Sequence, residues 1–422
     1  MKKNIVIVGG GAAGLFAAMR AAEQTRDITV TVIEQNNRMG KKLRITGKGR
    51  CNVTNDCDRD TFLANVPTNP RFLYAAINAL TTRDVMDCFE SLGVPLKVER
   101  GHRVFPVSDN AHDIADALVK RCRELGVQFA SGRVNRLLTE TDGEGGVRIT
   151  GVACGQREFP AEAVILCTGG ASYPTTGSDG NGYDLAEAVG HEIVSPIPSL
   201  VPLVCADSIC VDMMGLSLRN VRLTVYNKEK KKTIYEDFGE MLFTHYGVTG
   251  PLILSASAHM PDLVPGRYEL YINLKPALSE AELDARILSD FKKYVNKDFI
   301  NALSDLLPLK AIEPVIKLSG IDPRKKVNAI TKEERKHLGE VIQRLTLHPT
   351  THRPIKEAII TKGGVSVKEV NPKTMQSKLC AGLYFAGELL DVDAYTGGFN
   401  LQIAFSTAHL AALGAVAQVT EP

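Results

Sequence analysis

Glycines near the start of the chain are spaced as in a loop that binds a diphosphate. Residues 9–14 read G-G-G-A-A-G, a G-x-G-x-x-G pattern, between an apolar run at residues 5–8 and an alanine-rich stretch. In this pattern Gly9 allows a tight turn, Gly11 lets the backbone approach a pyrophosphate, and Gly14 lets a helix pack closely on its strand. The helix N-terminus would present its free N–H groups and the positive end of its dipole to the phosphates.

An acidic residue completes the pattern. Glu34 ends a second apolar run at residues 28–33, where a carboxylate can accept hydrogen bonds from both hydroxyls of an adenosine ribose. A strand, the glycines, a helix and this acid at these spacings predict a dinucleotide-binding unit. An ordinary glycine-rich turn would leave Glu34 unexplained.

Three further glycine-rich segments indicate which dinucleotide is bound. Residues 40–55 are polar and rich in cations that could meet phosphate and ring carbonyl oxygens, although a solvated basic loop is the alternative. Residues 163–170 and 382–388 are short apolar runs that end in glycines. Such contacts suit a dinucleotide held along its whole length, and the sequence holds no second strand, G-x-G-x-x-G and helix unit for NAD. We therefore predict one tightly bound FAD, with NAD(P)H as a transient visitor where it is used.

These motifs resemble a known group of flavoproteins. The first G-x-G-x-x-G, a mid-chain T-G-G, and G-L-Y-F-A-G-E before G-G-F-N-L-Q are similar to the two-dinucleotide-binding-domain flavoproteins. More narrowly, T-G-K-G-R-C-N-V-T-N at residues 46–55, F-T-H-Y-G-V-T-G-P at 243–251 and T-K-G-G-V at 361–365 resemble the bacterial aminoacetone-oxidase-like FAD-dependent oxidoreductase family, which is related to bile-acid dehydro-steroid reductases. The resemblance covers essentially the whole chain and implies an FAD-dependent oxidoreductase, but it names no substrate.

The predicted FAD contacts come from these segments and from one additional position. Val134 is added because flavoproteins of this type commonly present a backbone amide to the adenine at the start of a β excursion. The expected contacts are Gly9, Gly11, Ala13, Gly14, Glu34, Gln35, Lys42, Thr46, Gly47, Gly49, Arg50, Cys51, Asn52, Val134, Thr168, Gly169, Gly170, Gly387, Glu388, Gly398, Asn400 and Leu401.

Two residues are candidates for moving a proton. Tyr173 follows the Gly169-Gly170 turn, and His245 lies in a segment rich in turn residues. Histidine is the side chain best matched to proton transfer near neutral pH, but a structural, hydrogen-bonded His245 is an equal alternative. The nine histidines are scattered, so no metal site is expected.

The nine cysteines indicate neither a disulfide framework nor a zinc site, because their number is odd and no C-x-x-C occurs. Cys51 and Cys57 could be the redox pair of a flavin-linked disulfide reductase. However, five residues separate them, and Asp56 and Asp58 would oppose thiolate formation at Cys57. A structural Cys51 in a flavin-contacting loop is the preferred interpretation.

Composition excludes several classes of protein. The chain has 422 residues, 44% hydrophobic and 23% charged, with a net charge of +2, so we expect no polyanion partner. The basic cluster at residues 228–232 is interpreted as a hairpin turn. No apolar run approaches the ~18 residues of a membrane span, and cleavage of the start as a signal peptide would destroy the glycine loop. These observations predict a cytoplasmic protein with reduced cysteines that acts on a small molecule, and they give no indication of an oligomeric state.

The pattern along the chain predicts an α/β fold. A helix is expected to begin at residues 109–113, and residues 126–151 should form short strands broken by a turn at Asp142-Gly143. Residues 195–198, S-P-I-P, are interpreted as a domain hinge. Alternating apolar residues then indicate antiparallel strands, and capping boxes at 279–282 and 331–334 indicate helices.

We therefore predict a Rossmann-type FAD-binding domain formed by both chain ends, with two insertions. The FAD domain would comprise residues 1–195 and 346–422, an inserted antiparallel β domain residues 196–275, and an inserted small helical domain residues 276–345.

The predicted function is hydride transfer between bound flavin and a small or mid-sized amine, ketone or enone. The alternatives are a structural FAD in a protein that assists nucleic-acid modification, which the absence of basic patches disfavours, and the disulfide reductase above.

Overall fold

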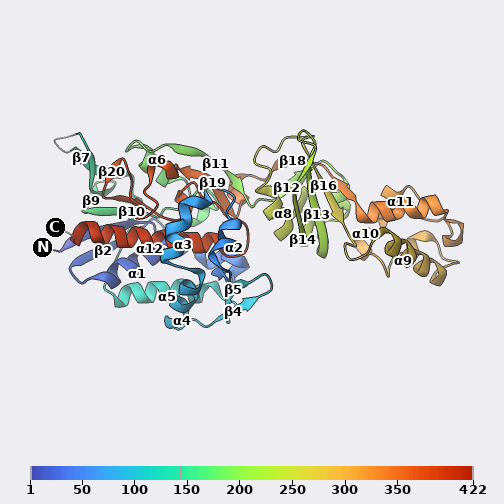
Figure 1. Cartoon of the computed structure of the whole chain (residues 1–422), viewed down its shortest axis with the longest axis horizontal. Helices are drawn as coiled ribbons and strands as arrows, with labels where there is room; N and C mark the ends of the chain where they lie inside the picture. The colour runs from blue at the N-terminus through green and yellow to red at the C-terminus, as the bar shows by residue number, and fades with distance from the viewer. Residues whose placement is uncertain (1, 142–144, 421–422) are drawn as a thin grey trace. The chain divides into compact units, whose positions relative to one another are not determined.

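A computed structural model describes residues 2–141 and 145–420, and the chain divides into two compact units (Figure 1). Unit 1 comprises Met1–Ser199 and Ile355–Pro422, so it draws on both ends of the chain. Unit 2 is the continuous segment Leu200–Pro354 between them. The predicted division into three domains stays a prediction, because the contacts group the β and helical insertions into one unit.

Unit 1 is built on a five-stranded parallel sheet, which confirms the Rossmann-type fold. Its central strands are continuous runs of apolar, mostly β-branched residues because helices cover both faces of a parallel sheet. In spatial order the strands are β21 (Leu383–Phe385), β10 (Ala163–Leu166), β1 (Lys3–Val8), β2 (Ile28–Glu34) and β6 (Gln128–Ser131).

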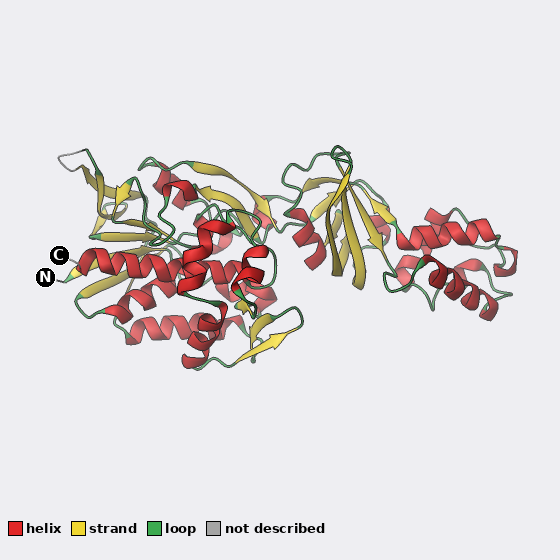
Figure 2. Ribbon diagram, in the orientation of Figure 1, coloured by secondary structure: helices red, strands yellow, loops and turns green. Residues whose placement is uncertain are grey.

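Helices pack together on this sheet (Figure 2), and the labels of Figure 1 show that they come from both ends of the chain. Helix α1 (Ala12–Gln24) contacts both α5 (Ala111–Glu124) and α12 (Phe399–Thr420). The Asn110 side chain caps α5, as predicted for residues 109–113. The other helices of unit 1 are α2 (Arg59–Ala64), α3 (Tyr74–Ala79), α4 (Thr82–Ser91) and α6 (Asn181–Glu187).

Within the described residues, α12 is the one helix long and apolar enough to cross a membrane. However, 67% of its most apolar stretch is buried inside the protein, and it contacts β10, β1 and β21. Its buried face also carries Gln402, Ser406 and Thr407, which are unfavourable against lipid but are hydrogen-bonded here. The helix is therefore a core element of unit 1.

Smaller sheets flank the parallel sheet of unit 1. The predicted β excursion is present, although its Asp142-Gly143 turn lies outside the described residues. One flanking sheet contains β3 (Thr54–Asn55), β5 (Arg103–Pro106) and β4 (Leu96–Glu99), and the other β20 (Cys380–Ala381), β8 (Val147–Cys154), β7 (Arg136–Thr141) and β9 (Arg157–Pro160).

Two antiparallel strands of unit 1 lie next in sequence to the chain connections with unit 2. These are β11 (Ile193–Ser199) and β19 (Ile360–Val365). The predicted hinge at residues 195–198 thus lies inside a strand. The pairing register shifts between Val194 and Ile197, where the chain accommodates a proline that has no N–H to donate.

Unit 2 combines an antiparallel sheet with helices around one apolar core. Leu270 of the sheet and Leu338 of a helix belong to the same buried cluster. In spatial order the strands are β17 (Leu345–Leu347), β16 (Tyr268–Asn273), β13 (Ser217–Asn227), β14 (Lys232–Thr244), β15 (Gly247–Thr249), β12 (Leu203–Cys205) and β18 (Pro349–His352).

Two helices of unit 2 begin where the sequence predicted. Capping boxes are present at Ser279 and Thr331, and residues 228–231 of the predicted basic cluster form the β13–β14 turn. The helices are α7 (Ile209–Asp212), α8 (Pro251–Ser257), α9 (Glu280–Lys293), α10 (Leu309–Ser319) and α11 (Lys332–Gln343).

Candidate functional site

The first glycine loop has the geometry of a phosphate cradle. A Cβ on Gly9, where φ is +102°, would lie 2.5 Å from the Cys167 carbonyl oxygen, and a Cβ on Gly14 would lie 1.8 Å from the Gly9 carbonyl oxygen. These values confirm the predicted turn and packing roles of the two glycines. A Cβ on Gly11 would meet no atom within 4 Å. Open space therefore lies in front of the N-terminus of α1, where an anion is favoured.

Glu34 is fixed at the rim of this loop. It ends β2 and is largely buried. Its Oε2 accepts the Gly10 N–H at 2.6 Å, and its Oε1 accepts the backbone and side-chain N–H groups of Asn36 at 2.8 and 2.6 Å. Since a carboxylate oxygen has two acceptor sites, Oε2 keeps one for a ribose hydroxyl. The neighbouring Gln35 donates to Gly177 O at 2.8 Å.

The loop predicted to contact the flavin is sharply bent. Left-handed φ values occur at Gly47, Lys48, Gly49 and Cys51. The side-chain oxygen of Asn52 is buried and has no hydrogen-bond partner among the described residues, so it is suited to accept a bond from a bound group. The hydroxyl of Thr46 is used within the loop, because it donates to Leu43 O at 2.7 Å.

A cluster that the sequence did not reveal joins four separate segments. Lys42 Nζ donates to Glu388 Oε2 at 2.6 Å and to Ser172 Oγ at 2.8 Å. Ser172 Oγ and the Thr361 N–H both donate to Glu388 Oε1 at 2.8 Å. The sequence predicted Lys42 and Glu388 as separate FAD contacts, and the structure pairs them. It missed Ser172 and Thr361, although Thr361 opens the T-K-G-G-V motif.

The glycines that end β10 and β21 bring this cluster close to α1. A Cβ on Gly170 would lie 2.5 Å from Thr361 Oγ1, and a Cβ on Gly387 would lie 3.0 Å from Ala13 Cβ. The Thr168 hydroxyl is buried and has no partner among the described residues. Gly169 takes a left-handed φ of +75°. The segments 168–170 and 387–388 therefore meet beside the first glycine loop.

The start of α12 is held against the end of the flavin-contacting loop. A Cβ on Gly398 would lie 2.3 Å from Thr54 O, and the Thr54 hydroxyl donates to Gln402 Oε1 at 2.6 Å. Gln402 is fully buried and positions the helix, but the sequence prediction left it out. Asn400 Oδ1 accepts the Ala394 N–H at 3.0 Å, and Asn400 Nδ2 donates to Ala394 O at 2.7 Å. These two bonds fix the preceding loop. Leu401 is half-buried beside it.

Val134 lies next to the predicted ribose site. Its loop is joined to the end of β2 because the Gly132 N–H donates to Glu34 O at 3.0 Å. The Val134 carbonyl accepts a bond from Asn181 Nδ2 at 2.9 Å.

These residues fit FAD. The space at Gly11, the acceptor at Glu34 and the orphaned polar atoms of Thr168 and Asn52 are the features that a dinucleotide would use. Each individual contact stays a prediction.

Arg50 differs from the other predicted contacts because protein carboxylates already compensate its charge. It pairs with Glu99 and Asp109, and these hydrogen bonds raise the pKa of its guanidinium. Its Cζ lies 4.1 Å from the centre of the Phe105 ring. The structure thus gives Arg50 a role in holding the loop.

The geometry does not favour a cysteine redox pair. Burial raises the pKa of the Cys51 thiol to about 12. Burial, followed by the charges of Asp58 and Asp56, raises the pKa of the Cys57 thiol to about 11. Both thiols are free, and neither is activated as a nucleophile.

The two proton-transfer candidates lie in different units. Tyr173, in unit 1, adjoins Ser172 of the Lys42 cluster and has a left-handed φ of +54°. His245, in unit 2, is exposed in the turn between β14 and β15, and its ring stacks edge-on with Tyr246 at 4.9 Å. Their catalytic roles stay predictions. No group of three or more metal-ligating side chains suited to a metal ion occurs in the described residues.

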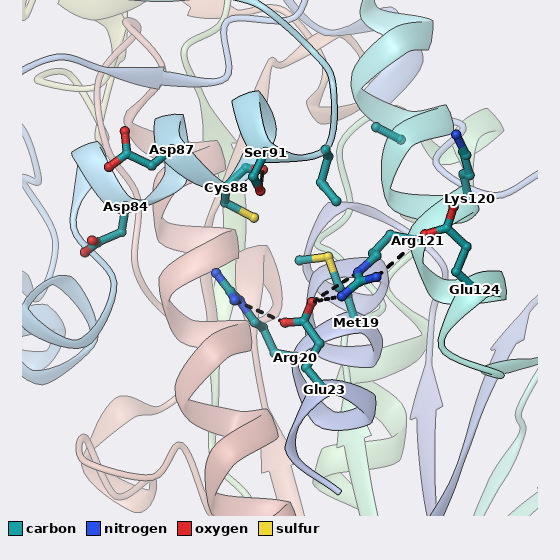
Figure 3. Close-up of a pocket in the computed structure, with 12 residues that line it drawn as sticks. Met19, Arg20, Glu23, Asp84, Asp87, Cys88, Ser91, Lys120, Arg121 and Glu124 are labelled. Carbon is teal, nitrogen blue, oxygen red and sulfur yellow. Dashed lines mark hydrogen bonds and ion pairs between the residues drawn. The ribbon is translucent and has the colours of Figure 1, made fainter. Parts of the chain in front are cut away.

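A cavity of about 660 Å³ lies elsewhere in unit 1, between α1, α4 and α5 (Figure 3). Its polar wall is held by ion pairs of Glu23 with Arg20 and Arg121, both at 3.2 Å. None of the predicted FAD contacts lines it. It is therefore separate from the candidate cofactor site.

Comparison with known proteins identifies the family. The family model described as "HI0933-like protein Rossmann domain" matches residues 3–414. The chain belongs to this family. A relative from Clostridium scindens, named 3-dehydro-bile acid delta(4,6)-reductase, is 31% identical over 97% of this chain and 98% of its own length. A second, from Escherichia coli, named ribosomal RNA dihydrouridine synthase, is 28% identical over 96% of each chain.

A solved structure supports the fold of this chain. The 3-ketosteroid delta1-dehydrogenase of Sterolibacterium denitrificans matches with a TM-score of 0.52 and 13% identity, over 99% of each chain. Membership of this family and the relative named as a reductase are consistent with a site whose residues fit FAD. The protein is an FAD-dependent oxidoreductase.

Proposed function

We propose that the protein reduces a carbon–carbon double bond conjugated with a carbonyl group in a small or mid-sized organic substrate. NAD(P)H would supply the reducing equivalents. The observation that carries the proposal is the 31% identity, over 97% of the chain, to a relative named as a delta(4,6)-reductase. The name dihydrouridine synthase describes related chemistry, because dihydrouridine is uridine with its C5–C6 double bond saturated.

The described residues would hold the cofactor in a defined orientation. Bound FAD supplies the two-electron chemistry, so the protein has to bind it, orient it and deliver a proton. The open space at Gly11 would hold the pyrophosphate and Glu34 the adenosine ribose. Lys42 and Glu388 would meet further polar groups of the cofactor. Saturating the double bond also requires a proton at the carbon next to the carbonyl, for which Tyr173 and His245 are the candidates.

Anaerobic stopped-flow absorbance measurements test the proposal. We expect NADH or NADPH to bleach the flavin absorbance, and a steroid Δ4-3-ketone added afterwards to restore it while the saturated ketone forms. A 3-ketone without the double bond is the matched control and should leave the flavin reduced. Flavin that neither nucleotide bleaches, or that the enone does not reoxidise, would contradict the proposal.

A second candidate is reduction of a uridine in ribosomal RNA. It is favoured by the relative of that name at 28% identity over 96% of the chain. The net charge of +2 is low for a protein that binds a polyanion, so we place a small molecule first and propose no nucleic-acid or membrane partner. Incubating the reduced enzyme with ribosomal RNA and measuring dihydrouridine by mass spectrometry separates the two.

We further propose that the protein works in the cytoplasm. All nine cysteines are free thiols, as expected in a reducing compartment, and reduced nicotinamide cofactors would be available there.

A further inference from the structure

The β4–β5 hairpin is the direct neighbour of the loop predicted to contact the flavin. Strand β5 pairs with β3, so that Asn55 lies opposite Arg103, and the Val53 N–H donates to Val104 O at 2.8 Å. A Cβ on Gly47 would lie 3.6 Å from the Phe105 ring. The turn of this hairpin, residues 100–102, is therefore placed at the edge of the candidate cofactor site.

Asn55 holds that turn against the segment that begins α12. Its side chain is buried, and Nδ2 donates to Gly101 O and to Gly397 O, both at 3.0 Å. Gly101 and His102 both have left-handed φ values, +76° and +57°. Such a conformation is costly for a residue other than glycine and persists only where its surroundings impose it. Asn55 thus fixes the position of His102.

The hairpin carries a guanidinium, that of Arg103, which forms no ion pair with any described carboxylate: Glu99 lies opposite it in the β4–β5 pairing, but its oxygens accept hydrogen bonds from Arg50. Arg50 and Arg103 lie near the same Phe105 ring, at 4.1 and 6.0 Å from its centre. Arg50 is paired with Glu99 and Asp109. Among the described residues, Arg103 forms no ion pair, and its Nε donates to Arg100 O at 3.0 Å.

The turn next to Arg103 is open to solvent. His102 is exposed, and its carbonyl accepts the Asp56 N–H at 2.7 Å. Arg103 is half-buried, so water screens its attraction to an anion less than at a fully exposed site. A planar guanidinium presents paired N–H donors that match a carboxylate.

We propose that Arg103, with His102 beside it, binds a carboxylate on the substrate, and that Asn55 is the residue that positions this element. The reducible substrate is then an enone that carries a carboxylate at a distance from its double bond. This inference rests on the proposed function, because it assigns the substrate class of the same site.

The test uses two probes that differ in one charge. 3-Oxochol-4-enoic acid and its methyl ester share the ring enone, and the acid alone is anionic. Binding to the FAD-loaded, full-length protein is measured by calorimetry, and reduction of each probe by product analysis. We expect the acid to bind at least about 10-fold more tightly than the ester, as for a charge-assisted hydrogen bond.

Variants then assign the preference to residues. Arg103→Ala should weaken binding of the acid about 10-fold and leave the ester unchanged, and Arg103→Lys should restore part of the loss because it keeps the charge without the fork. Glycine suits the left-handed φ of position 102, so the His102→Gly variant should fold normally. It should weaken binding of the acid by a smaller factor than Arg103→Ala does. Asn55→Ala should raise KM for the acid with little change in kcat. Arg157→Ala is the matched control, because Arg157 also lies over an aromatic ring, Phe159, at 4.5 Å but outside every predicted FAD segment.

Two results would overturn the inference. One is equal affinity of the wild-type protein for acid and ester, and the other is an Arg103→Ala effect of equal size on both. Reduction of both probes without preference would contradict this inference but leave the proposed function standing. A preference for the acid that depends on Arg103, without reduction of either probe, would contradict the proposed function but leave the carboxylate-binding site standing.

Discussion

The two units differ in where they place their polar groups. In unit 1, buried polar side chains such as Glu34, Thr361 and Gln402 join strand ends to loops. In the described part of unit 2 the buried polar side chains are fewer, Asn227, Ser257, Asp290 and Ser319. Its polar residues mostly cap helices or form ion pairs near the surface, such as Arg335 with Asp284 at 2.6 Å. Because buried polar groups cost stability unless they are paired, their concentration in unit 1 marks the part of the fold that is shaped for a ligand.

Unit 2 contains two glycines that lie closely against backbone atoms, as Gly9 and Gly14 do in unit 1. A Cβ on Gly247 would lie 2.2 Å from Leu203 O, and a Cβ on Gly250 would lie 2.9 Å from Met241 Cα. At the other glycines in the described part of unit 2, an added Cβ would meet no backbone atom at such short distances. Both tight glycines belong to residues 243–251, so this segment is the most constrained turn of the unit. That constraint is the structural reason to test His245.

The largest expected effect comes from Gly11→Val. A valine fits the protein because the space in front of Gly11 is open, but it would occupy the volume that the pyrophosphate needs. We expect a folded, colourless protein, as judged by circular dichroism and by flavin absorbance after gel filtration. Gly14→Val is the contrast, because its side chain would collide with Gly9 O and should prevent folding. A yellow Gly11→Val protein would remove the glycine loop from the FAD site.

The next largest effect is expected for a change in unit 2, at His245, and it concerns turnover and not FAD binding. His245→Asn should leave FAD content and melting temperature unchanged, since the residue is exposed in a turn of unit 2. If it transfers a proton, turnover should fall about 100-fold or more. Turnover per folded molecule is measured after flavin quantification. A lower melting temperature with intact turnover would show that His245 only supports the turn.

A smaller loss is expected for Glu34→Ala. Removing the carboxylate should weaken FAD binding by about 1.5–3 kcal/mol, the contribution of charge-assisted hydrogen bonds. Titration of apoprotein with FAD measures the dissociation constant. Glu34→Gln keeps an acceptor for the Gly10 N–H and should lose less. An unchanged constant for Glu34→Ala would mean that the carboxylate serves only the loop.

The smallest effect should be confined to unit 2. Thr331→Ala removes the N-cap of α11, which accepts the Glu334 N–H, and should destabilise unit 2 by about 1 kcal/mol. Denaturation followed by far-ultraviolet circular dichroism should show the shift, whereas flavin release from unit 1 should keep its midpoint. Thr331→Ser, which retains the hydroxyl, is the control. A matching shift in flavin release would show that the two units unfold as one.

Sequence predicted best where a local rule governs the outcome. The capping boxes at Ser279 and Thr331, the turn at Gly9 and the packing at Gly14 all follow from neighbouring residues, and all are present. The strand β11 was missed because its prolines are typical of a linker, whereas pairing with β19 overrides that preference.

The side-chain cluster at the candidate site could not be predicted in the same way. Lys42 and Glu388 are separated by most of the chain, and no local pattern specifies that they pair. The same holds for Asn55, whose amide links Gly101 to Gly397. Such contacts depend on the assembled topology, so sequence motifs named the segments of the site but not how their side chains meet.

The placement of α12 against α1 also sets the order in which a nascent chain can become functional. Unit 2 is continuous in sequence, so it can complete its contacts while residues 355–422 are still being synthesised. The sheet of unit 1 must wait, because β21 and α12 arrive last and supply one edge strand and a central covering helix. We therefore expect a chain truncated before β21 to fold unit 2 and to retain no flavin.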